Sequence, residues 1–164
     1  MDEVEIMFAV VSIGLGATAF MDVFAWVQNQ LFKIPGLNYA LVGRWIIGMV
    51  YGRFRHSTIL QSPSMRFERS IGWASHYTIG MFFVGCMLMV TGLDWLIEPS
   101  LWQPILLGAF SVSAPFLVMQ PAFGFGLAAS KAPIPWTARK RSVIAHLSFG
   151  VGVFFASLIW GLIT

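Results

Sequence analysis

Charged side chains are scarce in this sequence. Lys, Arg, Asp and Glu make up 10% of its 164 residues, whereas soluble domains average about 25%. Hydrophobic residues reach 57%, and the mean hydropathy is +0.76. A soluble chain of 18.2 kDa could not bury this much apolar surface, because small domains leave much of their surface exposed. The composition excludes a soluble globular protein and predicts a protein embedded in lipid.

Cysteine and an N-terminal basic segment are also lacking. The one cysteine, Cys86, lies in an apolar run, so there is no disulfide framework and no indication of the redox compartment. Residues 1–5 are acidic, whereas a cleaved signal peptide begins with a basic region. The first apolar run is therefore predicted to be a retained helix. The net charge of +3 comes from short basic blocks between apolar runs, which argues against nucleic acid as a partner.

Four apolar runs are long enough to cross a bilayer, which takes about 20 residues. They cover residues 6–28, 71–93, 102–121 and 142–163. A fifth run, 39–51, is shorter and contains Arg44, so it is predicted to be a re-entrant or interfacial helix. Whether it enters the bilayer stays open. The fold class is all-α: one polytopic transmembrane domain, with the third span kinked or ended by Pro115 and Pro121.

The basic residues predict the orientation of these spans. All ten lie in the two segments that follow the first and third spans: Lys33, Arg44, Arg53, Arg55, Arg66, Arg69, Lys131, Arg139, Lys140 and Arg141. Cytoplasmic loops of membrane proteins carry an excess of Lys and Arg. Both basic segments are therefore expected in the cytoplasm, with both termini on the opposite side.

A weak internal similarity relates the two halves of the chain. Residues 76–80 and 146–150 both read His-x-(Thr/Ser)-x-Gly, and each is preceded by a basic residue and serine. Met21-Asp22 and Met119-Gln120 end the first and third spans in a similar way. A tandem repeat of a helix hairpin would explain this pattern, and so would chance similarity between spans rich in Gly and Phe.

Each predicted span carries one polar side chain near its cytoplasmic end: Asp22, His76, Gln120 and His146. Asp22 and the two histidines lie roughly 6–9 Å inside the interface at 1.5 Å of rise per residue, and Gln120 lies at the boundary. A carboxylate within a span is costly and normally faces a partner inside the bundle. The four residues are therefore candidates for one polar layer that binds a ligand or relays protons.

Other roles for these residues stay open. With Met21 and Met119, the carboxylate and imidazoles could hold a transition metal, although no established ligand spacing is present. Two histidines on different helices could clamp a haem, but the neighbouring helices would have to leave room, and haem is not favoured. An Asp–His pair could also simply join helices.

The first basic segment holds a second set of candidates. Its cations could contact anionic lipid headgroups. Alternatively, Arg44, His56 and Glu68 could close the cytoplasmic mouth of the bundle. Arg44 lies in an apolar run and needs a phosphate or an acidic partner, which Glu68 or Asp22 could supply.

Several short motifs occur in a fixed order along the chain: Gly14-x-x-Ala17-Thr18-x-x-Met21-Asp22, Gly43-Arg44-Trp45, Gly52-Arg53-Phe54-x-His56, Gly72-Trp73-x-x-His76-Tyr77, Ala114-Pro115-Phe116-x-x-Met119-Gln120-Pro121-Ala122-x-Gly124 and Ala128-Ala129-Ser130. Together they resemble the small bacterial inner-membrane proteins grouped as domain of unknown function twenty-nine thirty-eight. The resemblance covers nearly the whole chain. It implies a four-helix protein of the bacterial inner membrane, and it implies no reaction. In that membrane, the orientation predicted from the basic residues makes both termini periplasmic.

Three function classes follow. The first is a membrane protein that binds or translocates a small ligand, ion or proton, either alone or as a homo-oligomer. The second is an accessory or assembly subunit of a larger membrane complex. The third is a membrane enzyme acting on a lipid or quinone, which no nucleophile–base or metal-catalytic motif supports. The sequence favours the first class.

Overall fold

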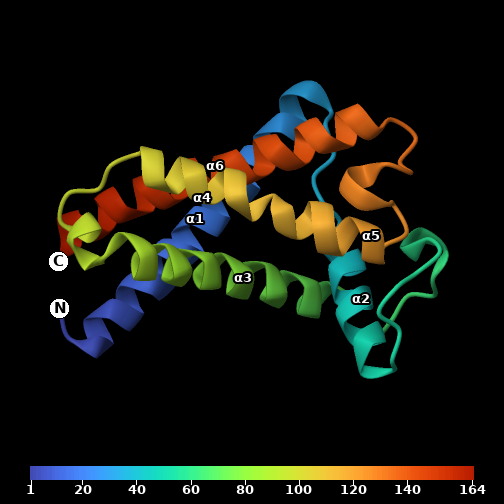
Figure 1. The fold of residues 1–164 in the computed structure, drawn as a ribbon, viewed down its shortest axis with the longest axis horizontal. Helices are drawn as coiled ribbons and strands as arrows, with labels where there is room; N and C mark the ends of the chain where they lie inside the picture. The colour runs from blue at the N-terminus through green and yellow to red at the C-terminus, as the bar shows by residue number, and fades with distance from the viewer. The chain divides into compact units, whose positions relative to one another are not determined.

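The computed structural model describes all residues, 1–164, and contains helices and no strands (Figure 1). Helix α1, Glu3–Phe32, begins with a capping box in which the Asp2 carboxylate accepts the Glu5 N–H and the Glu5 carboxylate accepts the Asp2 N–H. These two bonds satisfy N–H groups that have no partner within the helix. Helix α2, Tyr39–Val50, starts at Asn38, whose side chain accepts the Ala40 N–H.

The remaining elements include a third span that is interrupted. They are η1 (Ile59–Gln61), α3 (Glu68–Thr91), η2 (Leu93–Leu96), α4 (Trp102–Ser111), η3 (Pro115–Met119), α5 (Gln120–Ala122), η4 (Leu127–Ala129) and α6 (Pro135–Ile163). The η3 segment is a π-helical turn, in which the Gln120 N–H bonds to the Pro115 carbonyl. Pro115 lacks an N–H and cannot continue the α-helical ladder, which confirms the predicted interruption.

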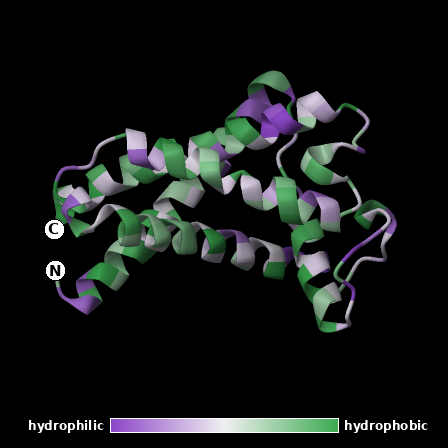
Figure 2. Ribbon diagram, viewed as in Figure 1, coloured by the Kyte–Doolittle hydropathy of each residue, from purple (hydrophilic) through white to green (hydrophobic).

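Four helices have the length and apolar composition needed to cross a membrane: Glu3–Phe32, Glu68–Thr91, Trp102–Ala122 and Pro135–Ile163. They match the four predicted spans and extend beyond several of the predicted ends. Figure 2 shows hydrophobic residues along these helices and hydrophilic residues in the connection between α2 and α3. Helix α2 has 12 residues, so at 1.5 Å per residue it is only about 18 Å long. A bilayer core of about 30 Å would need a longer helix.

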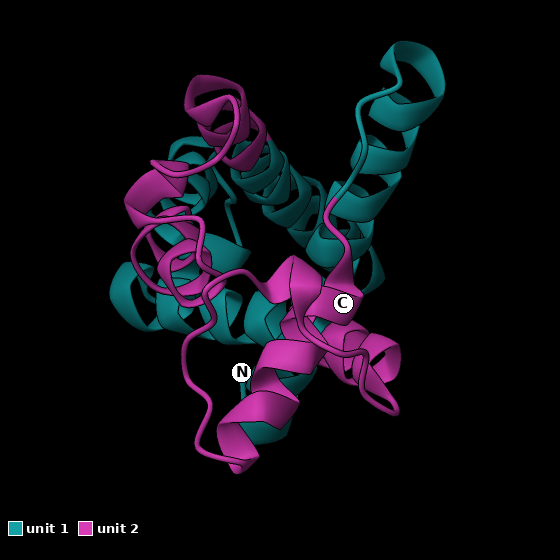
Figure 3. Cartoon of the chain, turned by 90° about the vertical axis from the view of Figure 1, so that its right-hand side faces the viewer, with its two compact units in different colours: residues 1–36, 77–111, 145–164 teal, residues 37–76, 112–144 magenta.

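The chain divides into two compact units, each built from segments far apart in sequence (Figure 3). Unit 1 consists of residues 1–36, 77–111 and 145–164, and unit 2 consists of residues 37–76 and 112–144. The sequence predicts one transmembrane domain. In the structure, the residues of α3 and of α6 are shared between the two units.

Unit 1 has its own apolar core. Small and branched side chains fill it, with Ile13, Val84 and Val153 fully buried beside Phe149. Small residues in membrane helices let backbones approach closely. In this unit, glycines lie where α1 meets α3 and where α4 meets α6. The two contacts have different registers, which bears on the predicted repeat.

The contact register does not follow the proposed repeat. A Cβ added at Gly80 would meet Thr18, whereas one added at Gly150 would meet the Pro104 carbonyl. If Met21 corresponds to Met119, the counterpart of Thr18 would be residue 116. Duplication of the hairpin therefore stays a prediction.

Unit 2 has a smaller apolar core than unit 1 and contains more charged residues. Its core is formed by Val42, Ile59, Ala122 and Phe123. Nine of the ten Lys and Arg residues lie in unit 2, whereas six of the seven Asp and Glu residues lie in unit 1. Glu68 is thus the one acidic residue of unit 2.

Candidate functional site

Arg44 and Glu68 form a nearly buried ion pair in unit 2. The Arg44 Nε donates to Glu68 Oε2 at 2.8 Å, and Nη2 donates to Oε1 at 2.9 Å. Only 11% and 14% of the two side chains are exposed. The hydrogen bonds to Glu68 raise the pKa of the Arg44 guanidinium above its usual value. The sequence left Glu68 and Asp22 as possible acidic partners of Arg44. In the structure, the partner is Glu68.

The pair forms where α2 crosses the start of α3. A Cβ at Gly43 would overlap the Glu68 carbonyl, and a Cβ at Gly72 would overlap the Tyr39 carbonyl. Only glycine permits this separation between the two backbones. The crossing places Arg44, which follows Gly43, beside Glu68, the first residue of α3.

Arg44 also organises the connection between α2 and α3. Its Nη1 donates to the carbonyl oxygens of Ile59 at 3.2 Å and Ser62 at 2.7 Å. The Glu68 carboxylate in turn accepts the Met65 N–H at 2.8 Å. The guanidinium therefore fixes both ends of η1 as well as the start of α3.

His56 lies next in this network. Its Nδ1 is 2.9 Å from the Ser62 hydroxyl, so Ser62 links His56 to Arg44. The backbone N–H of His56 donates to the Ala122 carbonyl at 2.8 Å, and the backbone N–H of Ile59 donates to the Phe123 carbonyl at 3.0 Å. The imidazole Nε2 is buried and has no hydrogen-bond partner.

Gln120 follows the π-helical turn and is 6% exposed. Its Nε2 donates to the Ser142 hydroxyl of α6 at 3.2 Å, while its Oε1 is buried without a partner. Such orphaned groups are rare in folded proteins, and π-helical turns are frequent at functional sites. The two buried side-chain atoms without partners, Gln120 Oε1 and His56 Nε2, both belong to unit 2.

We call the connected set Arg44, His56, Ser62, Glu68, Gln120 and Ser142 the polar junction. Two backbone hydrogen bonds join the segment containing His56 to residues 122 and 123, which lie two and three positions after Gln120. Four of the six residues are site candidates from the sequence. Ser62 and Ser142 were missed, because a hydroxyl gives no signal until its partner is known.

The other polar-layer candidates each have a hydrogen-bonding partner. In unit 1, the Tyr77 hydroxyl donates to Asp22 Oδ2 at 3.0 Å, and the Ser111 hydroxyl lies 2.8 Å from His146 Nδ1. In unit 2, the Tyr39 hydroxyl lies 2.8 Å from His76 Nε2.

An aromatic cluster surrounds His76. Tyr39 stacks on the imidazole with ring centroids 4.2 Å apart, and Trp73 meets it edge-on at 6.0 Å. The partners Tyr39, Tyr77 and Ser111 were not identified from the sequence, although Tyr77 directly follows His76.

The predicted layer is divided between the two units. Asp22 and His146 belong to unit 1, whereas His76 and Gln120 belong to unit 2. Convergence of all four on one ligand therefore stays a prediction.

The structure contains no group of three or more His, Cys, Asp or Glu side chains placed to hold a metal ion. Met21 packs against the apolar core of unit 1, and Met119 packs against that of unit 2. The metal-binding interpretation gains no support from this arrangement.

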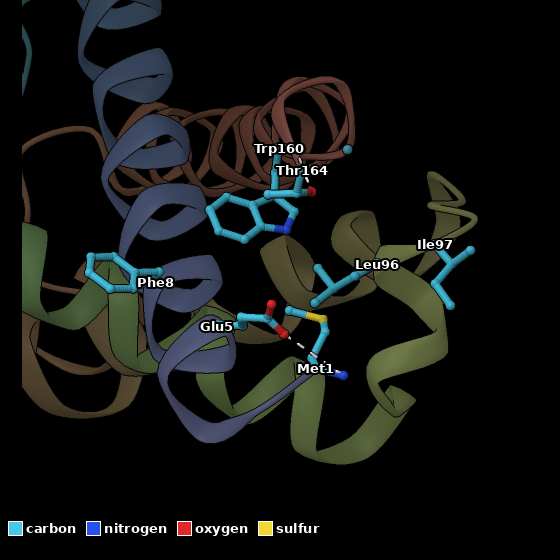
Figure 4. A pocket seen from close by; sticks show the side chains of 8 residues that line it. Met1, Glu5, Phe8, Leu96, Ile97, Trp160 and Thr164 are labelled. Carbon is cyan, nitrogen blue, oxygen red and sulfur yellow. Dashed lines mark hydrogen bonds and ion pairs between the residues drawn. The ribbon is translucent and has the colours of Figure 1, made fainter.

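Unit 1 has a pocket of about 600 Å³ between the start of α1, the η2 region and the end of α6 (Figure 4). Its lining is mainly apolar and includes Phe8, Leu96, Ile97 and Trp160, with Glu5 as the charged side chain. None of the sequence-predicted site residues lines it.

The four long apolar helices and the absence of strands define an all-α polytopic membrane protein. Residues 11–160 match the family model described as "Protein of unknown function (DUF2938)". The chain belongs to this family, which confirms the resemblance seen in its motifs. Comparison with curated proteins and with solved structures gives no match.

Proposed function

We propose that this chain is a multi-pass protein of the bacterial inner membrane that binds a small polar ligand at the polar junction, in the cytoplasmic leaflet. The concentration of basic residues in unit 2 supports a cytoplasmic position for that unit. The termini would then be periplasmic.

The buried side-chain oxygen of Gln120, which has no hydrogen-bond partner, carries the proposal. An unsatisfied polar group that is buried costs about 1–3 kcal/mol, so a ligand that hydrogen-bonds to it would recover this free energy. His56 Nε2 is a second buried atom without a hydrogen-bond partner, and it lies on the adjoining segment. His56 is linked through Ser62 to Arg44, which holds Glu68.

The charge of unit 2 favours a neutral or anionic ligand over a cation. Its one carboxylate, that of Glu68, is held by Arg44, so no acidic side chain of this unit remains to pair with a cation. The open side chains suit either class, because an amide and an imidazole can each donate or accept a hydrogen bond. The Ser142 hydroxyl, which does both, can serve either orientation of the Gln120 amide.

The test is thermal unfolding of the full-length protein in detergent, at constant ionic strength, with inorganic phosphate, glycerol or Mg²⁺ as the probe. Phosphate or glycerol is expected to raise the Tm of the wild type more than that of Gln120→Met. Both solutes stabilise folded proteins generally, and a ligand that binds only the native state adds to this effect. Gln61→Met, at an exposed position of the same unit, should keep the wild-type response. The proposal is wrong if neither phosphate nor glycerol gives a Tm increase that depends on Gln120, whatever the response to Mg²⁺.

Gln120→Met also separates binding from folding. Met is apolar and of similar length, so Gln120→Met removes the unpaired buried oxygen at the loss of the hydrogen bond to Ser142. Because Ser142 is only half-buried, the Tm of the protein without probe should rise. A variant that is more stable but responds less to the probe has lost a ligand group. A variant that is less stable even without probe would show that the Gln120 amide serves the fold, against the proposal.

An accessory or assembly role is the second candidate. The observation that favours it is that Asp22, His76 and His146 already have protein partners in Tyr77, Tyr39 and Ser111. Under this role, Asp22→Asn should change only stability and the yield of a larger complex, measured by native mass spectrometry of the protein extracted from its own membrane. Extraction of the chain alone would contradict it.

A further inference from the structure

Three exposed aromatic side chains of unit 2 have a cationic residue close to them, either as a neighbour in the chain or by contact with the ring. Phe54 stands between Arg53 and Arg55 in the chain and is 61% exposed. Phe67 is 62% exposed, with the Arg66 guanidinium 4.6 Å from its ring centroid. Trp136 is 65% exposed, with the Lys140 ammonium 5.8 Å from its ring. We use the name aromatic–basic anchors for these three sets of residues: Arg53-Phe54-Arg55, Arg66 with Phe67, and Trp136 with Lys140.

The backbone at Phe67 is strained. Its φ of 64° lies in the left-handed region, where a bulky side chain is a genuine outlier. Such a conformation is energetically costly, and it clusters at functional positions. Glycine would relieve this strain. The Phe67 ring is therefore expected to have a role other than stabilising the fold.

The cations of these anchors have no acidic partner. Seven Lys and Arg residues of unit 2 are exposed, and none of them forms an ion pair: Arg53, Arg55, Arg66, Arg69, Lys131, Lys140 and Arg141. Arg139 is occupied by the Ala128 carbonyl at 2.7 Å. Unit 2 thus presents exposed positive charge that no ion pair within the chain neutralises.

Two of the anchors continue directly into candidate membrane spans. Phe67 immediately precedes α3, and Trp136 is the second residue of α6. Side chains within one turn of a span end lie at headgroup depth, where aromatic rings are enriched and cations meet lipid phosphates. A bilayer is therefore within their reach by chain continuity alone.

We propose that the aromatic–basic anchors bind the phosphates of anionic phospholipids, with the rings inserted at headgroup depth. Lys and Arg side chains near a membrane are attracted to an anionic surface, so the seven exposed cations can select anionic over neutral lipid. This inference is independent of the ligand proposed for the polar junction, because it uses different residues and a different partner.

The experiment compares the full-length protein in nanodiscs of phosphatidylcholine with nanodiscs of an equal mixture of phosphatidylcholine and phosphatidylglycerol. The wild-type Tm should be higher in the mixture, and salt near 1 M should remove the difference, because it shortens the screening length to about 3 Å. Arg66→Gln with Lys140→Gln should lose most of this difference. Phe110→Ser, which removes an exposed aromatic of unit 1, should shift the Tm equally in both lipids.

Phe67→Gly distinguishes lipid binding from folding. Relief of the strained φ should raise the Tm in phosphatidylcholine, while loss of the ring should shrink the gain from phosphatidylglycerol. An unchanged gain in either the charge variant or Phe67→Gly overturns the proposal. So does a wild-type protein with the same Tm in both lipids, which would leave the anchors to a protein partner.

Discussion

Arg44 holds Glu68 through two parallel hydrogen bonds and uses its remaining nitrogen, Nη1, for two carbonyls of the connection between α2 and α3. One guanidinium therefore joins three segments that are separated in the chain. A planar guanidinium suits this role, because its donors point in fixed directions that match a carboxylate on one edge. Lysine could not make the same set of bonds.

Arg44→Met is expected to destabilise the protein strongly. It leaves the Glu68 carboxylate buried without its cation, and breaking a buried pair from one side costs about 3–5 kcal/mol. The double variant Arg44→Met/Glu68→Met should lose less than the two single variants add up to, because no charge is left unpaired. Thermal unfolding of the detergent-solubilised protein measures all three. Arg69→Met, at an exposed position nearby, should be near neutral, and equal losses at Arg44 and Arg69 would contradict the role of the pair.

Hydropathy and charge were sufficient to predict the four long helices, because the apolar runs are long and every basic residue lies in the two segments between them. Pro115 likewise marked the interruption of the third span, since its missing N–H breaks the ladder wherever the helix runs. These features are local. They depend on a window of sequence rather than on its partners.

The polar junction could be predicted only in part. Arg44, His56, Glu68 and Gln120 stood out because polar groups near apolar runs are costly. Their arrangement depends on the crossing at Gly43 and Gly72 and on hydroxyl partners such as Ser142. Contacts between residues far apart in the chain are not encoded in hydropathy, so the sequence could not choose Glu68 over Asp22 as the partner of Arg44.

Gly72→Ala should disrupt the crossing of α2 and α3. The new methyl group would overlap the Tyr39 carbonyl, and overpacking of this kind costs about 1–3 kcal/mol. The loss should outweigh the gain in helix propensity. A lower Tm in detergent is the expected result. Gly161→Ala is the matched control, because a Cβ there meets nothing within 4 Å, and it should be neutral or stabilising. If both substitutions behave alike, the crossing does not require glycine.

Gly124→Ala should release the segment that carries His56. Gly124 has a φ of 88°, and a Cβ there would overlap the carbonyl oxygen of Ser57. The substitution therefore combines a left-handed backbone, which costs about 1–2 kcal/mol in residues with a Cβ, with a direct clash. Tryptic cleavage at Arg53 and Arg55 is expected to accelerate.

Gly52→Ala is the control for this release. Gly52 also has a positive φ, 72°, but open space around it, so its substitution adds strain without the clash. Cleavage of the Gly52→Ala variant should stay close to that of the wild type. Equal acceleration in both variants would mean that backbone strain alone, and not the docking of residues 56–59 on residues 122–124, controls exposure of the segment.

The orientation of the chain can be tested by cysteine labelling. In a Cys86→Ala background, Glu98→Cys and Ser64→Cys place one thiol at an exposed position in each of two different connections. Because the connection containing Ser64 is basic and the one containing Glu98 is not, the positive-inside rule expects Ser64 in the cytoplasm and Glu98 in the periplasm. A membrane-impermeant maleimide added to intact bacterial cells should therefore label Glu98→Cys alone, and Ser64→Cys should react only after permeabilisation. Labelling of Ser64→Cys in intact cells would invert the orientation and place the polar junction in the periplasmic leaflet.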